Sequence, residues 1–274
     1  MVGSRDAIPA DALEDIAYLA RSVNRVVLLE TLASGSYTRR DLIEQTGIAR
    51  TTIGRIVNEF EERGWIERTS DGDYTATPVG VQVSDEFMPL VEAMAVVRRL
   101  GDMVAWLQAV EPSIDLHHFG DATVRRPESV DPTEPLTRYI DALQRASEFH
   151  CLVGVAPPLS FEAVMRDEVV KGDLRVEHVI SEEEFAYVRD RPERVTRWRE
   201  YAEAGANVYC YDGIVPCNFL IFDETVYIGK SQSEWGEPYA AIESENEVVR
   251  TWAHEIIETY RAKSKRLGPE AFGN

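Results

Sequence analysis

Residues Thr38 to Arg63, TRRDLIEQTGIARTTIGRIVNEFEER, decide the fold of the first part of this chain. The stretch predicts a short helix, a tight turn at Gly47 and a longer second helix. Thr38 is placed to cap the first helix, and Asp41 follows three residues later, at the capping-box position. The spacing therefore predicts a helix-turn-helix.

The second helix of this stretch has two unlike faces. Its large apolar residues fall within about 100° of one another and predict a buried stripe: Ile53, Ile56, Val57 and Phe60. The opposite face carries Thr51, Arg55 and Asn58, whose side chains can contact base edges in a major groove. An ordinary amphipathic surface helix is the alternative interpretation.

Arginines surround this outward face. A cation in the first turn of a helix opposes the helix dipole, so Arg39 and Arg40 indicate contact with a phosphate backbone. Two solvated arginines are the alternative. The residues predicted to bind DNA are Arg39, Arg40, Arg50, Thr51, Thr52, Arg55 and Asn58.

The flanking segments predict a winged helix over residues 1–80. Apolar residues at helical spacing over 11–33, interrupted near Ser22, predict supporting helices. Two strand-like runs around the Asp71-Gly72 turn predict a β-hairpin wing. Asp71 and Asp73 make the tip of that wing acidic, which leaves its contact with phosphate an open question.

Residues 81–112 predict a helical linker. Apolar residues follow one another at intervals of 3, 4, 3, 3, 4 and 3 as far as Leu107, the spacing of a coiled-coil seam: Phe87, Leu90, Met94, Val97, Leu100, Val104 and Leu107. Such a seam beside a winged helix favours a homodimer, because symmetric half-sites require paired recognition helices. Packing of the stripe against the chain's own second domain is the alternative.

Residues 113–274 predict an α/β domain. The predicted strands alternate with helices, which favours a mainly parallel sheet covered on both faces. The strands are expected at 114–118, 149–156, 174–180, 207–211, 218–222 and 225–229. The whole chain is therefore expected to be α+β, with a winged helix, a helical linker and an α/β domain.

Composition limits the compartment and the partners. The 274 residues are 44% hydrophobic and contain no apolar run near the roughly 18 residues of a membrane span, so we expect a soluble, cytoplasmic protein. Cys151, Cys210 and Cys217 lack Cys-x-x-Cys spacing, which indicates buried thiols and neither zinc nor disulfides. No cofactor is expected.

The net charge of −19 opposes DNA binding in general, because affinity for DNA depends on neutralising phosphates. Only four of the 29 cationic residues are lysines, and this excess of acids over lysine resembles proteins of salt-loving archaea. Between Arg21 and Asn58, however, six arginines stand against three acids, a local net charge of +3. This island favours DNA as the partner of the winged helix.

Several stretches together resemble a known family. They are ARSVNR at 20–25, YTRRDL at 37–42, ARTTIGRI at 49–56, FEERGWIE at 60–67, AGANVYCYDG at 204–213 and VPCNFLIFDETVYIG at 215–229. The chain resembles haloarchaeal and methanogen regulators that join a winged helix to a methanogenesis-regulatory domain. The resemblance implies a transcription factor without naming its target.

The last of these stretches also looks like the closing hairpin of phospholipase-D-type domains, which sugar-sensing archaeal regulators reuse as an effector-binding module. Active members carry His-x-Lys with an Asp five residues beyond the Lys. Aligning Asp223 with that Asp places Pro216 at the His position and Asn218 at the Lys position. Neither residue can attack phosphorus or hold a phosphate, so the resemblance implies an inactive hydrolase.

The carboxyl ends of the strands are the expected effector site, because α/β sheets leave a crevice there. The candidate effector-binding residues are Tyr209, Tyr211, Asp212, Cys217 and Asn218; a well-packed strand end is the alternative. The spacing of His117, His118, His150 and Cys151 matches no metal site. No phosphate loop and no Gly-x-Ser-x-Gly motif occurs.

These observations predict a dimeric, sequence-specific DNA-binding regulator that responds to a small molecule. One alternative is a phospholipase-D-like phosphodiesterase that uses its winged helix for protein docking. A second is a pure interaction protein, which the acidic wing favours.

Overall fold

The computed structural model describes residues 9–111, 114–126, 134–230 and 240–273, which divide into two compact units, residues 1–94 and 95–274. The helix that spans the boundary, α5, runs from Pro78 to Leu100. No helix among the described residues combines the length and the apolar character that a membrane span requires.

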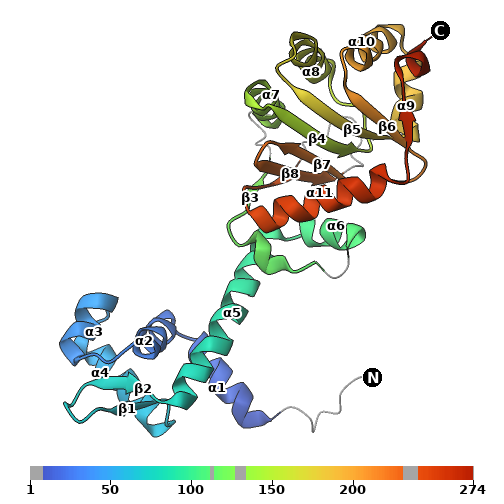
Figure 1. Cartoon of the computed structure of the whole chain (residues 1–274). Helices are drawn as coiled ribbons and strands as arrows, with labels where there is room; N and C mark the ends of the chain where they lie inside the picture. Colours follow the sequence, from blue (N-terminus) through green and yellow to red (C-terminus); the bar gives the residue numbers. More distant parts are fainter. Residues whose placement is uncertain (1–8, 112–113, 127–133, 231–239, 274) are drawn as a thin grey trace. The chain divides into compact units, whose positions relative to one another are not determined.

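The N-terminal unit is a winged helix (Figure 1). Its elements are α1 (Ala10–Ala20), α2 (Val23–Ala33), α3 (Arg39–Thr46), α4 (Arg50–Glu62), β1 (Ile66–Arg68), β2 (Tyr74–Ala76) and the first part of α5. The Thr38–Asp41 capping box forms, with the amide of Asp41 donating to Thr38 Oγ1 at 3.1 Å. Gly47 ends α3 at a φ of 66°, a conformation that glycine adopts without a Cβ penalty.

The core of this unit holds the helix-turn-helix rigid. All four residues of the predicted apolar stripe on α4 have 0% exposure: Ile53, Ile56, Val57 and Phe60. Phe60 packs against Trp65 with ring centroids 5.6 Å apart. Gly80 lies so close to the backbone of Trp65 that an added Cβ would meet its carbonyl oxygen at 1.9 Å. Only glycine, which has no Cβ, permits this close approach. The start of α5 therefore packs directly on the residue that precedes β1 of the wing.

The predicted helical linker is interrupted. Gly101 has a φ of 57° and separates α5 from α6 (Met103–Val110). The predicted strand around Ile114 to His118 is also wrong, because Leu116–Phe119 form a short 3₁₀ helix capped by Asp115. Alternation over only five residues cannot distinguish a strand from a single helical turn.

The C-terminal unit contains an eight-stranded sheet in the order β10-β6-β5-β4-β7-β8-β9-β3. Its strands are β3 (Thr123–Arg125), β4 (Glu148–Val153), β5 (Arg175–Ser181), β6 (Asn207–Tyr211), β7 (Cys217–Phe222), β8 (Thr225–Lys230), β9 (Ala241–Ser244) and β10 (Lys265–Leu267). Its remaining helices are α7 (Glu134–Arg145), α8 (Leu159–Lys171), α9 (Glu182–Arg189), α10 (Pro192–Glu203) and α11 (Glu247–Arg261).

The predicted mainly parallel sheet is wrong, because the sheet is mixed. Only β4–β5 and β5–β6 pair in parallel, and the other five pairings are antiparallel. Crossover helices connect β4 to β5 and β5 to β6, as parallel strands require. The turn between β7 and β8 is only Asp223-Glu224, so these strands must run antiparallel.

Helices cover both faces of the sheet (Figure 1). Alternate residues of β4 point to different cores: Phe149, Cys151 and Val153 join the core under α7, α8 and α10, whereas Leu152 joins the core that contains α6 and α11 residues. This alternation decides which site residues can meet.

Candidate functional site

The predicted DNA-reading face of α4 is accessible in the N-terminal unit. Thr51, Arg55 and Asn58 are exposed on the side of α4 opposite its buried stripe, and Thr52 is half-buried. Arg50 is exposed, and its side chain makes no hydrogen bond or ion pair with any described residue. The arrangement presents hydroxyl, guanidinium and amide groups together, which is the chemistry of base and phosphate contact.

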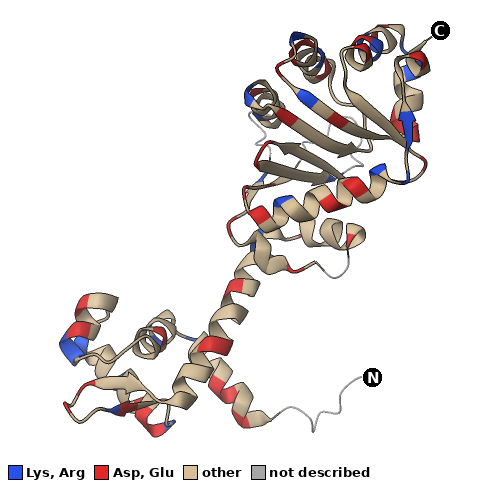
Figure 2. Cartoon of the chain, viewed as in Figure 1, with Lys and Arg blue, Asp and Glu red and all other residues tan. Residues whose placement is uncertain are grey.

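The other cations of this surface have weak partners. Arg40 Nε donates to Glu44 at 2.8 Å and Arg55 Nη1 donates to Glu59 at 2.7 Å, both along single helices. Arg39 is partly buried and donates to the Tyr74 hydroxyl at 2.9 Å. Helix α3 begins with Arg39 and Arg40, and Figure 2 shows the blue of Lys and Arg on this helix. Exposed ion pairs contribute only about 0.3–0.5 kcal/mol on a helix, so phosphate can replace these partners.

One member of the basic island has a structural role. Arg25 lies 3.7 Å over the Tyr18 ring and donates to Glu59 at 3.4 Å. The Tyr18 hydroxyl also donates to Glu59, and burial together with this hydrogen bond raises the pKa of Tyr18 to about 12. Because Arg25 helps to hold α1 against α4, the sequence island overstates the charge available to DNA.

The wing has no cation at its tip. Asp71 is exposed beside Gly72, whose φ is 87°, and the nearby cation Arg68 pairs with Glu61 at 3.2 Å. Anionic side chains repel phosphate, so α3 and α4 are better suited to DNA than the wing tip.

The five candidate effector residues are divided between the two faces of the sheet. Tyr211 packs against Tyr260 of α11 with ring centroids 4.8 Å apart, and Tyr209 joins the same core. The buried Cys217 thiol donates to the Trp106 carbonyl at 3.3 Å, and burial raises its pKa to about 12. Asp212 is exposed, and only Asn218 points to the opposite face.

That opposite face contains a cavity of about 200 Å³ between the sheet and the helices α7 and α8. Its aromatic walls are Tyr139, Phe149, Phe161 and Tyr227, and its polar groups include His178 and Asn218. No acidic residue lines it among those that the structure describes. Sequence reasoning missed these residues except Asn218, although the lone His178 within an apolar strand was a usable signal.

Two buried side chains of the C-terminal unit, His178 and Glu184, have polar atoms without a partner among the described residues. His178 is 1% exposed, its Nδ1 lies 3.4 Å from the Tyr201 hydroxyl, and its Nε2 has no partner among the described residues. Burial lowers the pKa of His178 to about 3, so the ring is neutral. Both carboxyl oxygens of Glu184 are also without a partner in the described part of the chain, and burial raises the pKa of Glu184 well above the usual value. Each such group costs about 1–3 kcal/mol.

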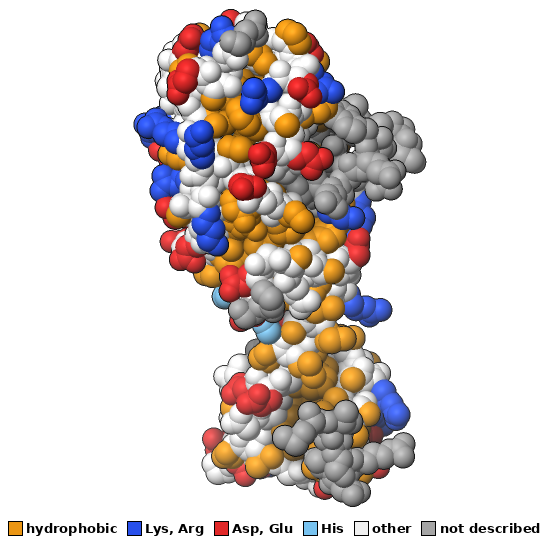
Figure 3. Space-filling model, turned by 90° about the vertical axis from the view of Figure 1, so that its right-hand side faces the viewer, with side chains coloured by type: hydrophobic (Ala, Val, Ile, Leu, Met, Phe, Trp, Pro, Cys, Tyr) orange, Lys and Arg blue, Asp and Glu red, His pale blue; other side chains and the backbone are white. Residues whose placement is uncertain are grey.

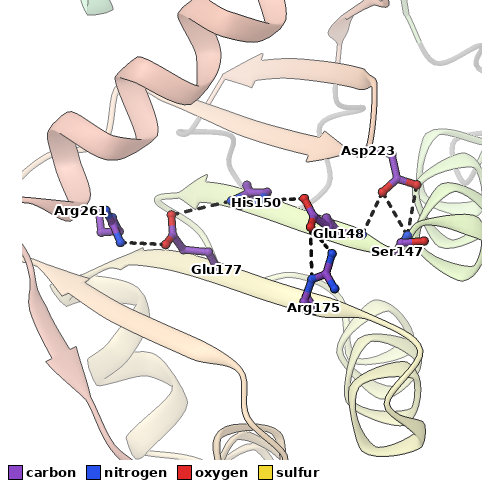
Figure 4. A network of polar contacts seen from close by, with 7 residues as sticks. All are labelled: Ser147, Glu148, His150, Arg175, Glu177, Asp223 and Arg261. Carbon is purple, nitrogen blue, oxygen red and sulfur yellow. Dashed lines mark hydrogen bonds and ion pairs between the residues drawn. The ribbon is translucent and has the colours of Figure 1, made fainter.

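The positions aligned with a phospholipase-D site carry structural hydrogen bonds. Asp223, at a φ of 47°, accepts from the amides of Ser147 and Glu148 at 3.1 and 2.9 Å (Figure 4). Asn218 Oδ1 accepts from the Gly154 amide at 2.9 Å. With proline at position 216, the described residues at these aligned positions supply no nucleophile.

Two of the histidines, His150 and His254, lie close together in the C-terminal unit. The rings of His150 and His254 lie 4.9 Å apart, and His150 sits between Glu148 and Glu177 in the network of Figure 4. Within the described ranges, no group of three His, Cys, Asp or Glu residues is arranged to hold a metal.

Comparison with known families places both units. Residues 13–99 match the HVO_A0261 N-terminal domain, and residues 132–263 match the middle domain of the methanogenesis regulatory protein FilR1. Each match covers one of the two domains of the chain. The resemblance seen in the sequence is thereby confirmed, and the chain is regulator-like in both of its domains.

More distant likenesses assign no function. TrmBL2, an archaeal chromatin protein, is 13% identical, with 92% of this chain and 98% of that chain covered at a TM-score of 0.40. Nuc, a phospholipase D family member from Salmonella typhimurium, is 12% identical, with 54% of this chain and 99% of that chain covered at a TM-score of 0.41. An IclR homolog from Microbacterium sp. strain HM58-2 is 16% identical, with 87% of this chain and 97% of that chain covered at a TM-score of 0.23. No curated protein matches the chain.

Proposed function

We propose that the protein is a sequence-specific, DNA-binding transcriptional regulator that works as a homodimer and responds to a small molecule through its C-terminal unit. The observation that carries the proposal is the polar, exposed side of α4, opposite a stripe with 0% exposure. A helix held in this way can enter a major groove without rearranging the core of its own unit.

The two kinds of DNA contact can be separated by mutation. Binding would be measured on a site selected from random DNA and on a scrambled copy, at several salt concentrations. Arg55→Ala should cost about 1–3 kcal/mol on the selected site and little on the scrambled one, because it would remove a base contact. Arg50→Ala should weaken both alike and lower the salt slope by about 1, because it would remove a phosphate contact.

Arg39→Ala should behave like Arg50→Ala, but it also breaks the contact with Tyr74, so Arg50 gives the cleaner comparison. Arg145→Ala, an exposed arginine of α7, is the matched control. Equal losses on both DNAs for Arg55→Ala and Arg50→Ala would refute the division between reading and anchoring residues.

The dimer is proposed from apolar residues that remain exposed. Leu90, Met94 and Val97 of α5 are 48%, 54% and 40% exposed, as are Leu13 and Ile16 of α1 at 53% and 44%. Figure 3 shows hydrophobic side chains at the surface of the N-terminal unit. Such exposure favours an interface between copies. Met94→Glu should shift the mass measured by light scattering from dimer to monomer, and an unchanged mass would exclude this interface.

The rival proposals have direct tests. A generic phosphodiester substrate should give no turnover, and turnover abolished by Asp223→Ala would favour the phosphodiesterase. A winged helix used only for protein docking should not retain genomic DNA fragments. Retention of DNA at high salt would argue against a role limited to protein docking. High salt is the appropriate condition, because the composition of the chain resembles that of proteins from salt-loving archaea.

A further inference from the structure

We infer that the cavity between α7, α8 and the sheet binds a small, uncharged molecule built on one six-membered ring with one polar substituent. Binding itself is inferred from the cavity alone, whereas its role as the effector site depends on the proposed function. Four observations lead to this ligand class.

The first observation is the size and character of the space. A cavity of about 150 Å³ accommodates benzene, so the 200 Å³ present here holds a ring with one small substituent. Aromatic side chains form much of the wall, and Tyr139 meets Tyr227 edge to face with centroids 5.0 Å apart. Such walls favour a flat ring, because aromatic edges and faces attract one another.

The second observation is Gly229, which lines the cavity from the interior of β8. Its φ is outside the left-handed region, and an added Cβ would meet only the Ala240 carbonyl oxygen at 3.5 Å, an ordinary contact. The backbone therefore does not require glycine, which weakens a strand. Glycine in a strand commonly marks close approach of a ligand, and here it keeps the cavity open.

The third observation is the unpaired nitrogen of His178. The side chain lines the cavity and is 1% exposed, and its Nε2 has no partner among the described residues. Buried polar groups almost always have a hydrogen-bond partner. Because this nitrogen is itself buried, the ring must turn toward the cavity before a ligand hydroxyl can donate to it or accept from it, whichever neutral tautomer the Tyr201 hydroxyl selects at Nδ1.

The fourth observation is the lack of a countercharge. No Asp, Glu or Arg lines the cavity within the described part of the chain. Lys230 contributes to the lining but pairs in register with Cys217, which places its exposed side chain toward the other face of the sheet. A buried charge without a partner is costly, so the ligand is neutral.

Binding can be tested with phenol, toluene and benzoate as probes, using calorimetry on the full chain. Phenol should bind once and saturably, toluene at least about tenfold more weakly and benzoate not measurably. Gly229→Val should weaken phenol about tenfold or more by filling the cavity. Thr225→Val, an isosteric change on the same strand outside the cavity, is the control. No saturable binding of phenol, benzoate binding as tight as phenol, or phenol binding unchanged in Gly229→Val would each overturn the inference.

His178 is tested by the preference for phenol over toluene. His178→Phe keeps a ring in place but removes the nitrogen, so phenol should fall to the affinity of toluene while toluene binding persists. Where this variant also loses toluene, the smaller His178→Leu supplies the same comparison. An undiminished preference for phenol in either variant would remove His178 from the site.

The role of the ligand is read separately from its binding. Retention of DNA would be measured with and without saturating phenol. Phenol binding without DNA retention would preserve the cavity site and contradict the proposed function. DNA retention without phenol binding would support the proposed function and overturn the cavity site. A change in retention that disappears in Gly229→Val would support both.

Discussion

The two units place their functional polar groups in opposite environments. On α4, Thr51, Arg55 and Asn58 are exposed, and the one ion pair among them is a surface pair at 2.7 Å. In the C-terminal unit, His178 and Glu184 are 1% and 2% exposed and have polar atoms that no described residue pairs. The first environment suits a charged polymer that remains hydrated, and the second suits a small molecule that leaves water.

This difference predicts how each unit responds to mutation. A surface that binds through exposed groups depends on the core behind it only for its position. A buried site depends on the same side chains for both folding and ligand contact, because unsatisfied groups in a low dielectric carry large energies. Substitutions in one unit should therefore leave the fold of the other unit intact.

Gly80→Ala should have the largest effect. A Cβ at residue 80 would meet the Trp65 carbonyl oxygen at 1.9 Å, and backbone can relieve such an overlap only by moving. We expect a loss of about 3 kcal/mol in the N-terminal unit, at the upper end of the range for overpacking. Hydrogen exchange measured by mass spectrometry should rise in peptides before residue 94 and stay unchanged beyond it.

Gly54→Ala is the matched control for this prediction. A Cβ at residue 54 of α4 meets nothing within 4 Å, so alanine should stabilise the helix by about 1 kcal/mol. Equal destabilisation by both substitutions would show that helical glycine, rather than close packing on Trp65, decides the result. Faster exchange in the C-terminal unit would contradict the independence of the two units.

The sequence predicted the first unit better than the second for a physical reason. The exposed and buried sides of α4 follow from a helical period that is local, so residues 51 to 60 were sufficient to assign them. The cavity depends on the faces of four strands, and those faces are set by register with partners far away in the chain. Tyr209 and Asn218, close in sequence, consequently point to different sides of one sheet.

The parallel or antiparallel direction of the strands also could not be predicted from the local sequence pattern. Alternating helices and strands indicated parallel pairing, but β7 joins the sheet beside β4 without a helix before it. The connection from β6 to β7 spans only residues 212–216, and it leads to an antiparallel pairing. A short loop that carries the chain past two strands has no signature in hydrophobic periodicity.

Glu184→Gln should have an intermediate and pH-dependent effect. Burial raises the pKa of Glu184 well above 4.5, so the folded chain keeps this proton to a higher pH than the unfolded chain does. Below about pH 4.5 the carboxyl is neutral in the unfolded chain as well. As the pH rises, only the unfolded chain releases the proton, and stability falls by up to about 1.4 kcal/mol per unit until the folded pKa is reached.

Glutamine cannot release a proton, so the unfolding free energy of the variant should rise relative to that of the wild type as the pH rises from 5 to 7. Urea unfolding at both values measures the difference in unfolding free energy. Glu183→Gln, an exposed neighbour on α9, is the control. Parallel pH profiles for the wild type and Glu184→Gln would mean that the buried carboxyl is ionised and paired.

Thr38→Ala should have a smaller effect, limited to the first helix of the helix-turn-helix. Thr38 Oγ1 accepts from the Asp41 amide at 3.1 Å, and loss of an N-cap costs about 1 kcal/mol. The hydrogen bonds from Thr38 to the Asp41 carboxylate lower the pKa of Asp41, so the stabilisation from these bonds is lost as the pH falls through that lowered value. Thr38→Ser should retain the cap. Identical unfolding curves for both variants would mean that the cap contributes nothing.

Glu44→Gln should have the smallest effect, and it tests whether the α3 cations are held loosely. Glu44 pairs with Arg40 at 2.8 Å, and both side chains are largely exposed, at 61% and 84%. Removing the acid should release Arg40 and reduce repulsion of phosphate, raising DNA affinity about twofold, which matches the few tenths of a kcal/mol of an exposed pair. Glu92→Gln on α5 makes the same change of charge and should leave affinity unchanged. An increase in DNA affinity above tenfold for Glu44→Gln would mean that Glu44 blocks DNA in the free protein. The α3 cations would then be held by their acidic partner and not freely available to phosphate.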